Sequence, residues 1–180
     1  MRVVEKAEAL SLLEANRREL GLEASSCIVC GLLNLPARDA SLLGQTEHGV
    51  VLLVRFAVRR GHLMVCSKRC LTHPAELGLS AFLDLQALLW GASVALERAL
   101  KPTRTFLASL GATVQLPMTA PHFHFHALPL FETGEETRPA NVFSWSKGLV
   151  LYDDDREVAA LRDELLRAWP SQEVPLAPPG

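Results

Sequence analysis

The sequence has little net charge, and it lacks a long uninterrupted stretch of apolar residues. Its 180 residues carry 18 Lys and Arg against 20 Asp and Glu, a formal charge of -2, which indicates no basic surface for a nucleic acid polymer. Apolar runs such as Gly49 to Val54 are far shorter than the roughly 20 residues of a membrane-spanning helix. Glu5 and Glu8 stand where a signal peptide would be apolar. We therefore expect a cytoplasmic protein that binds neither a membrane nor a nucleic acid polymer.

Cysteine is also scarce, with four in the chain. Disulfides are rare in the cytosol, so Cys27, Cys30, Cys66 and Cys70 are better interpreted as metal ligands, reactive thiols or core residues. The spacing Cys27-x-x-Cys30 is typical of half a zinc site, which needs a second pair of ligands. The alternative is that Cys27 and Cys30 are unliganded thiols in a loop. Cys66 is expected to be a small buried residue of a strand.

The spacing of apolar residues predicts a mixture of helices and strands. The clearest helix is expected over 81–100, where leucine and alanine recur at i, i+3, i+4 and i+7. A helix is also expected over 4–20, and another runs to about Trp169, opened by Asp154 and Glu157 as a capping pair. Residues 26–48 are interpreted as a loop. Strands are expected over 49–56, 62–66, 104–110, 120–128 and 149–152.

These elements suggest an α+β protein with one domain, since 180 residues suit a single core. We assign 25–169 to this domain, including the C-terminal helix, and 1–24 to an N-terminal helical extension. The proline-containing tail over 170–180 is expected to be disordered.

The most distinctive segment is Pro121-His-Phe-His-Phe-His-Ala-Leu-Pro129. Because side chains alternate along a strand, His122, His124 and His126 should share one face, while Phe123 and Phe125 share the other. We expect the phenylalanines to be buried and the imidazoles to line an exposed groove. Clustered imidazoles can bind a metal, or one can attack phosphorus while its neighbours protonate the leaving group. The plainer alternative is an exposed strand whose histidines have no task.

These residues resemble the histidine triad (HIT) superfamily. His122 to Leu128 matches the pattern His-φ-His-φ-His-φ-φ, in which φ is apolar, and Gly61 to Cys70 is similar to the family's Gly-His segment. The resemblance covers roughly residues 25–130. It implies an antiparallel sheet of about five strands with a long helix packed on one face, and a homodimer.

The resemblance also implies roles for individual residues. His124 would be the nucleophile that takes up a nucleotidyl group as a covalent phosphohistidine. His126 would contact the phosphate and help the leaving group depart, and His62 would complete the site. Thr119 would contact phosphate, and Trp145 would stack on a base unless it is only a packing residue. The reaction would be hydrolysis or nucleotidyl transfer at the α-phosphate of a nucleotide or another phosphorylated small molecule.

One branch of the superfamily, which includes galactose-1-phosphate uridylyltransferase, carries a zinc site with a Cys-x-x-Cys pair. Carried over to this sequence, its ligands would be Cys27, Cys30, Cys70 and His122, with Cys70 replacing a histidine. A Cys₃His set is a normal closed structural zinc site. His73 is a rival fourth ligand.

The sequence departs from the family pattern at positions that recognise nucleotides. Val54 stands where an aspartate usually holds the ribose hydroxyls, and Met118-Thr-Ala-Pro121 replaces Gln-Ser-Val before the triad. Two further hypotheses therefore stay open. The protein is a non-catalytic nucleotide-binding or sensing protein, or the histidines themselves hold a catalytic metal with His124 and His126 as ligands.

Overall fold

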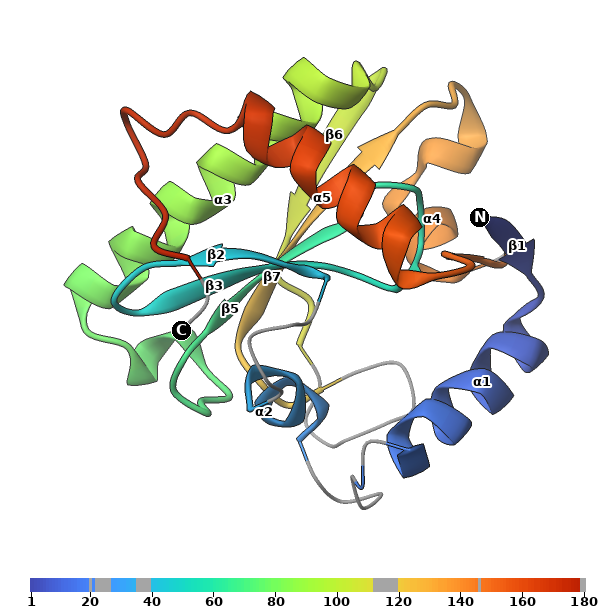
Figure 1. The fold of residues 1–180 in the computed structure, drawn as a ribbon, viewed down its shortest axis with the longest axis horizontal. Coiled ribbons are helices and arrows are strands. Elements are labelled where there is room, and N and C mark those ends of the chain that lie inside the picture. Colours follow the sequence, from blue (N-terminus) through green and yellow to red (C-terminus); the bar gives the residue numbers. More distant parts are fainter. Residues whose placement is uncertain (20, 22–26, 35–39, 112–119, 146, 179–180) are drawn as a thin grey trace.

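The computed structural model describes residues 1–178 apart from 20, 22–26, 35–39, 112–119 and 146, and its centre is an antiparallel sheet of five strands (Figure 1). Their order across the sheet is β2-β3-β5-β7-β6. This confirms the predicted α+β class and the five-stranded sheet. The strands are β2 (Leu42–Gln45), β3 (Gly49–Leu53), β5 (Leu63–Ser67), β7 (His124–Leu130) and β6 (Arg104–Ala108).

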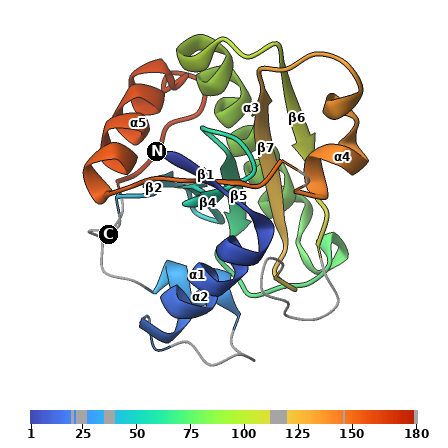
Figure 2. The same cartoon turned by 90° about the vertical axis from the view of Figure 1, so that its right-hand side faces the viewer.

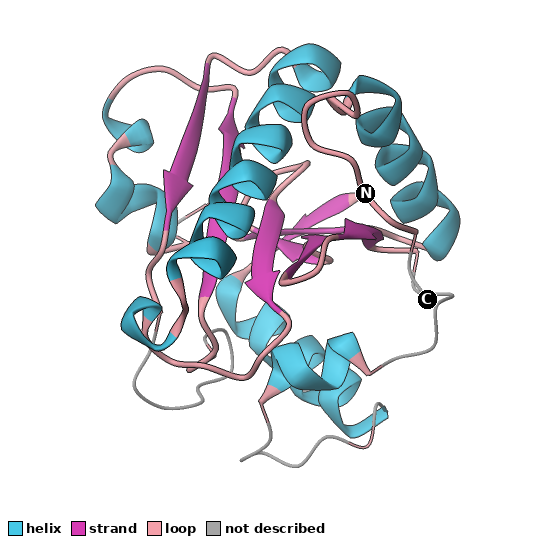
Figure 3. Ribbon diagram, turned by 90° about the vertical axis from the view of Figure 1, so that its left-hand side faces the viewer, coloured by secondary structure: helices cyan, strands magenta, loops and turns pink. Residues whose placement is uncertain are grey.

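The long helix α3 (Leu79–Leu100) covers one face of this sheet, beside α5 (Asp155–Ala168) (Figures 1 and 3). The apolar positions that predicted it, such as Leu88 and Ala92, are fully buried. Phe123 and Phe125 belong to the same core. By length and composition, α3 is apolar enough to cross a membrane, with mean hydropathy 1.5. Here its apolar side packs on the sheet and on α5.

The opposite face of the sheet carries α1 (Lys6–Glu19) and α2 (Ile28–Leu33), as Figure 2 shows together with Figure 1. Val29 of α2 packs against Val50 and Leu52 of β3 and Cys66 of β5. This side of the sheet contains the candidate site. The sequence predicted only a loop over 26–48, so α2 and β2 correct that prediction.

A second, three-stranded sheet has the order β1-β8-β4. The N-terminal amine pairs with Asp153 and with Glu157, the latter at 2.9 Å. The N-terminus is thereby joined to the start of α5 (Asp155–Ala168) before α1 begins. The strands are β1 (Arg2–Val4), β8 (Leu149–Leu151) and β4 (Phe56–Ala57), and the remaining elements are α4 (Pro139–Phe143) and short 3₁₀ turns at Pro74–Glu76 and Glu135–Thr137.

The expectation of a disordered tail is wrong for residues 170–178. The indole N–H of Trp169 donates to the carbonyl oxygen of Val174 at 2.7 Å. The backbone of Ala177 pairs with that of Gln45 beside β2. The prolines prevent regular secondary structure here, but the apolar side chains between them, such as Val174, are buried against the core.

Candidate functional site

The four residues that the family resemblance implied as zinc ligands come together. Cys27 is the N-cap of α2 and Cys30 lies in its first turn, Cys70 follows β5, and His122 precedes β7. One ligand atom from each lies within 4.8 Å of all the others. Cys66 is fully buried, as expected of a core residue. Within the described part of the chain, His73 is not a member of this cluster.

Hydrogen bonding orients His122 for metal binding. Its Nε2–H donates to the carbonyl oxygen of Ser67 at 2.8 Å, which leaves the Nδ1 lone pair facing the thiols. Nδ1 lies 3.5 Å from the Sγ atoms of both Cys27 and Cys30. A hydrogen bond on the far nitrogen is the usual way in which a metal-ligating imidazole is held in its tautomer. Burial lowers the pKa of His122, so the ring is neutral, as a ligand must be.

The thiols of this cluster are arranged for a cation. Burial and the neighbouring thiols of Cys70 and Cys27 raise the pKa of Cys30 to about 12. A bound divalent ion reverses this effect, because a coordinating thiol loses its proton. Three thiolates and one neutral imidazole fit a tetrahedral zinc ion without an open position. The site is therefore a structural zinc site that ties α2 to the strands bearing the histidines.

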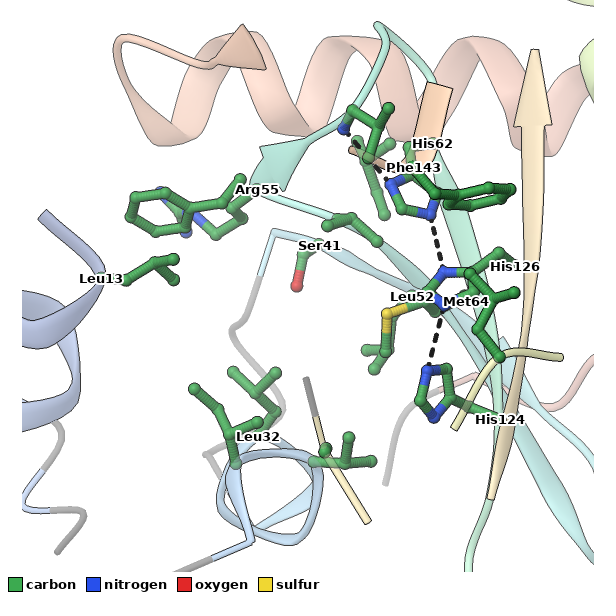
Figure 4. Close-up of a pocket in the computed structure, with 18 of the residues that line it drawn as sticks. Leu13, Leu32, Ser41, Leu52, Arg55, His62, Met64, His124, His126 and Phe143 are labelled. Carbon is green, nitrogen blue, oxygen red and sulfur yellow. Dashed lines mark hydrogen bonds between the residues drawn. The ribbon is translucent and has the colours of Figure 1, made fainter. Parts of the chain in front are cut away.

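His62, His126 and His124 form a continuous chain of hydrogen bonds beside this cluster (Figure 4). The backbone N–H of Val58 donates to His62 Nδ1 at 3.5 Å, and His124 Nδ1 donates to the carbonyl oxygen of His122. Between these ends, His62 Nε2 lies 2.9 Å from His126 Nδ1, and His126 Nε2 lies 3.1 Å from His124 Nε2.

The two backbone partners determine which nitrogen carries each proton when the rings are neutral. Because His62 Nδ1 accepts, its Nε2–H must donate to His126 Nδ1, and His126 Nε2–H must donate to His124 Nε2. Burial first, and the neighbouring histidines second, lower the pKa of His62 to about 3 and that of His126 to about 2. Burial also lowers the pKa of His124. These hydrogen bonds therefore leave His124 Nε2 without a proton, and they place the N–H of His126 beside it.

The histidines open onto a pocket of about 240 Å³ between the sheet, α1 and α2. His62, His124 and His126 lie along one side of it, with Leu32 and Leu13 across the space (Figure 4). The histidines are less exposed than the predicted groove implied, since His124 is only 6% exposed. A neutral nucleophile flanked by a donor in a largely apolar pocket suits attack on phosphorus.

The predicted site residues fall into separate groups. His122 does not share the pocket, because β7 begins only at His124 and the His122 side chain faces the cysteines. Within the described residues, the metal cluster contains one histidine only, so the hypothesis of a metal held by His124 and His126 is wrong. Trp145 does line the pocket. Thr119 lies outside the described residues.

Sequence reasoning missed several contributors to this site. The Val58 amide and the Ser109 hydroxyl, which donates to the His124 carbonyl oxygen at 2.9 Å, carry no motif. The pocket walls from α1 and α2 were missed because their partners lie far away in the sequence. The apolar face of the helix predicted over 4–20 was the one feature of the sequence that could have indicated the wall from α1.

Comparison with known proteins identifies the family. The chain is 30% identical over 115 residues to an uncharacterized HIT-like protein of Mycoplasma genitalium, covering 62% of this chain and 77% of that protein. No family model matches the sequence. With this relative, its fold and its histidine motif, the chain belongs to the HIT-like proteins.

Solved structures show the same fold at lower identity. A zinc-bound histidine triad family protein of Mycobacterium smegmatis superposes with a TM-score of 0.58 at 18% identity, covering 81% of this chain and 96% of that one. A Hit-like protein of Bartonella henselae gives 0.60 at 13% identity, with coverages of 81% and 98%. A histidine triad nucleotide-binding protein of Sulfolobus tokodaii gives 0.55 at 16%, with coverages of 71% and 82%.

Proposed function

We propose that this protein is a HIT-type hydrolase or nucleotidyltransferase that acts at the α-phosphate of a nucleotide through a covalent phosphohistidine on His124. The observation that carries this proposal is the hydrogen-bond chain through His62, His126 and His124. It leaves His124 Nε2 without a proton, as the acceptor from His126 Nε2 at 3.1 Å, and both rings line the pocket, so a phosphoryl group that enters there would take the place of this hydrogen bond.

In the proposed reaction, His124 Nε2 attacks phosphorus and the bond from phosphorus to the leaving group breaks. His126 Nε2–H hydrogen-bonds to the leaving atom, which departs with the electron pair of the broken bond and takes its proton from solvent. Water then attacks phosphorus, the phosphorus–nitrogen bond breaks and returns its electron pair to His124 Nε2, and the attacking water loses a proton to solvent. An acceptor hydroxyl in place of water gives transfer instead of hydrolysis. The neutral rings keep the nucleophile available without a separate base.

The zinc site supports this chemistry from outside the pocket. Zinc would be held by Cys27, Cys30, Cys70 and His122, and it supplies no step of the reaction. Its contribution is to fix the His122 backbone, whose carbonyl oxygen accepts the proton of His124 Nδ1. That contact keeps the reactive Nε2 free of a proton.

The first experiment measures turnover and covalent labelling on one zinc-loaded sample. Nucleoside phosphoramidates, dinucleoside polyphosphates and sugar nucleotides are screened, and the protein is quenched for mass spectrometry. We expect a nucleotidyl group on His124, and a loss of at least about 10³-fold in kcat for His124→Ala. The control is His48→Ala, a histidine outside the pocket. Full activity in His124→Ala, or a label on another residue, would contradict the proposal.

A second candidate is a nucleotide-binding or sensing protein without catalysis. It is favoured by the pocket lining, in which the described residues include no carboxylate to hold ribose hydroxyls. This candidate predicts that nucleotides raise the melting temperature, because they bind only the folded state, while no nucleotide is turned over. Trp145, which lines the pocket, would stack on the bound base in either case.

We also propose that the protein is a cytoplasmic homodimer that pairs through the edge of its central sheet. Among the residues that the structure describes, β6 pairs with β7 on one side and with no strand on the other, so it is an edge strand of this sheet. Edge strands offer unpaired backbone groups to a second chain, and Leu107 in this strand is 48% exposed.

A further inference from the structure

The floor of the pocket beside the histidines is apolar. Met64 of β5 lies opposite His126 of β7 on one side and opposite Leu52 of β3 on the other. Residues that face each other across an antiparallel ladder point to the same side of the sheet. The row His126, Met64, Leu52 therefore runs from the histidines into the pocket, and the two residues that follow the histidine in this row are apolar.

The walls of the pocket on the side of α2 are apolar as well. Ile28, Val29 and Leu32 of α2 line one side, and Leu13 of α1 lies further along (Figure 4). Among the described residues that line the pocket, no carboxylate is present, the charged side chain is Arg55, and the neutral polar side chains outside the histidines are Asn16 and Ser41, away from the row His126, Met64, Leu52. Arg55 pairs with Asp155, so its charge is already partly neutralised.

A group rich in hydroxyls would be poorly accommodated on these surfaces. Each hydroxyl buried against leucine, isoleucine or methionine loses its hydrogen bond to water without gaining another. An aromatic ring or an alkyl chain gains by leaving water in the same place. The lining therefore discriminates between substrates by the group that remains attached to phosphorus.

We propose that the group retained on phosphorus is aromatic or aliphatic and poor in hydroxyls, and that it seats on Leu52, Met64 and α2. This inference rests on the proposed attack of His124 on phosphorus. It extends the proposed substrate class from nucleotides to aryl- or alkyl-bearing phosphoryl compounds, and among nucleotides it favours deoxyribonucleotides over ribonucleotides.

Binding is tested first, because it needs no turnover. Isothermal calorimetry on the zinc-loaded protein compares phenylphosphonate, ribose 5-phosphate and inorganic phosphate. We expect phenylphosphonate to bind at least tenfold more tightly than ribose 5-phosphate. Equal or tighter binding of ribose 5-phosphate overturns the inference.

Turnover is then compared with one common leaving group. The substrates are p-nitrophenyl phenylphosphonate and the p-nitrophenyl esters of uridine and thymidine 5′-monophosphate. In each, the bond from phosphorus to His124 Nε2 forms, p-nitrophenol leaves, and water releases the acid. We expect the order phenylphosphonate, thymidine, uridine in kcat/KM. Selective binding of phenylphosphonate without turnover would contradict the proposed function and support this inference. Equal kcat/KM for all three substrates would support the proposed function and contradict this inference.

Two variants connect the preference to the named surface. Met64→Gln is nearly isosteric at a half-buried position, and it should reduce the preference for phenylphosphonate over ribose 5-phosphate at least fivefold. Leu32→Ser tests the α2 wall, and an unchanged zinc content shows that α2 has kept its place. Leu32→Met keeps the wall apolar and should retain the preference. An unchanged preference in both Met64→Gln and Leu32→Ser overturns the inference.

Discussion

At the residue scale, the site depends on imidazoles that stay neutral inside the protein. Burial lowers the pKa of His62 to about 3 and that of His126 to about 2, from an ordinary value of 6.5. The unfolded chain takes up protons on both rings below about pH 6.5, whereas the folded protein does not. The free energy of unfolding should therefore fall as the pH drops from about 6.5 towards 3, by up to about 1.4 kcal/mol per pH unit for each histidine. Urea unfolding of the zinc-loaded protein at pH 7, 6 and 5 measures this slope.

The slope can be assigned with single variants. His62→Gln removes one titrating ring and should reduce the pH dependence by about 1.4 kcal/mol per pH unit between pH 6 and 5. The matched control is His48→Ala, which removes a partly exposed histidine that lies outside the hydrogen-bonded series of His62, His126 and His124. If His62→Gln kept the full slope, the ring would not be neutral in the folded protein.

At the element scale, the sequence predicted the parts of the fold that have regular apolar spacing. The helical spacing of leucine and alanine identifies α3, the short apolar runs identify β3 and β5, and the alternation of histidine and phenylalanine identifies β7. α2 has six residues including a glycine, and its N-cap is a cysteine instead of Ser, Thr, Asp or Asn. Its stability comes from the zinc site and from packing on β3. These contacts join residues far apart in the sequence, so the spacing of apolar residues within α2 does not predict the helix. β1 forms through pairing with β8 at the other end of the chain.

The zinc ligands were predictable for a different reason. Cys27 and Cys30 have a spacing that stands out in any sequence, and Cys70 and His122 followed from the family motifs. The pocket lining has no such signal, because Leu13, Leu32 and Leu52 look like ordinary core residues until the fold places them together. Sequence reasoning therefore identified the histidines that line the pocket and missed the apolar surface beside them.

This view of α2 gives a prediction about metal loss. The double substitution Cys27→Ser and Cys30→Ser should abolish zinc binding and lower the free energy of unfolding by more than about 4 kcal/mol. Hydrogen exchange should show loss of protection in Ile28–Leu33, with α3 much less affected. Cys66→Ala is the matched control, since Cys66 is buried but is not a ligand, and it should retain one zinc per chain. Retention of zinc by the double variant would contradict the ligand assignment.

At the scale of the whole molecule, one pocket is assembled from distant parts of the chain. Leu13 comes from the N-terminal helix and Trp145 from beyond the histidine strand, and the nitrogen of Lys6 lies 5.3 Å from the centroid of the Trp145 ring. The pairing of β1 with β8 fixes this arrangement. The histidine strand β7 lies next to β6 at the edge of the sheet, so a second chain that paired with β6 would lie one strand away from His124 and His126.

The proposed dimer makes this edge testable. Two copies of β6 related by a two-fold axis would pair antiparallel and join two five-stranded sheets into one. We expect light scattering coupled to size exclusion to give twice the mass of one chain at micromolar concentration. Leu107→Lys introduces a charge at the exposed position of the edge strand and should shift the protein to a monomer. Leu79→Lys, at a 74% exposed leucine at the start of α3, is the matched control and should remain a dimer. A protein that stays monomeric at all concentrations, or a Leu107→Lys variant that stays dimeric, would contradict pairing through β6.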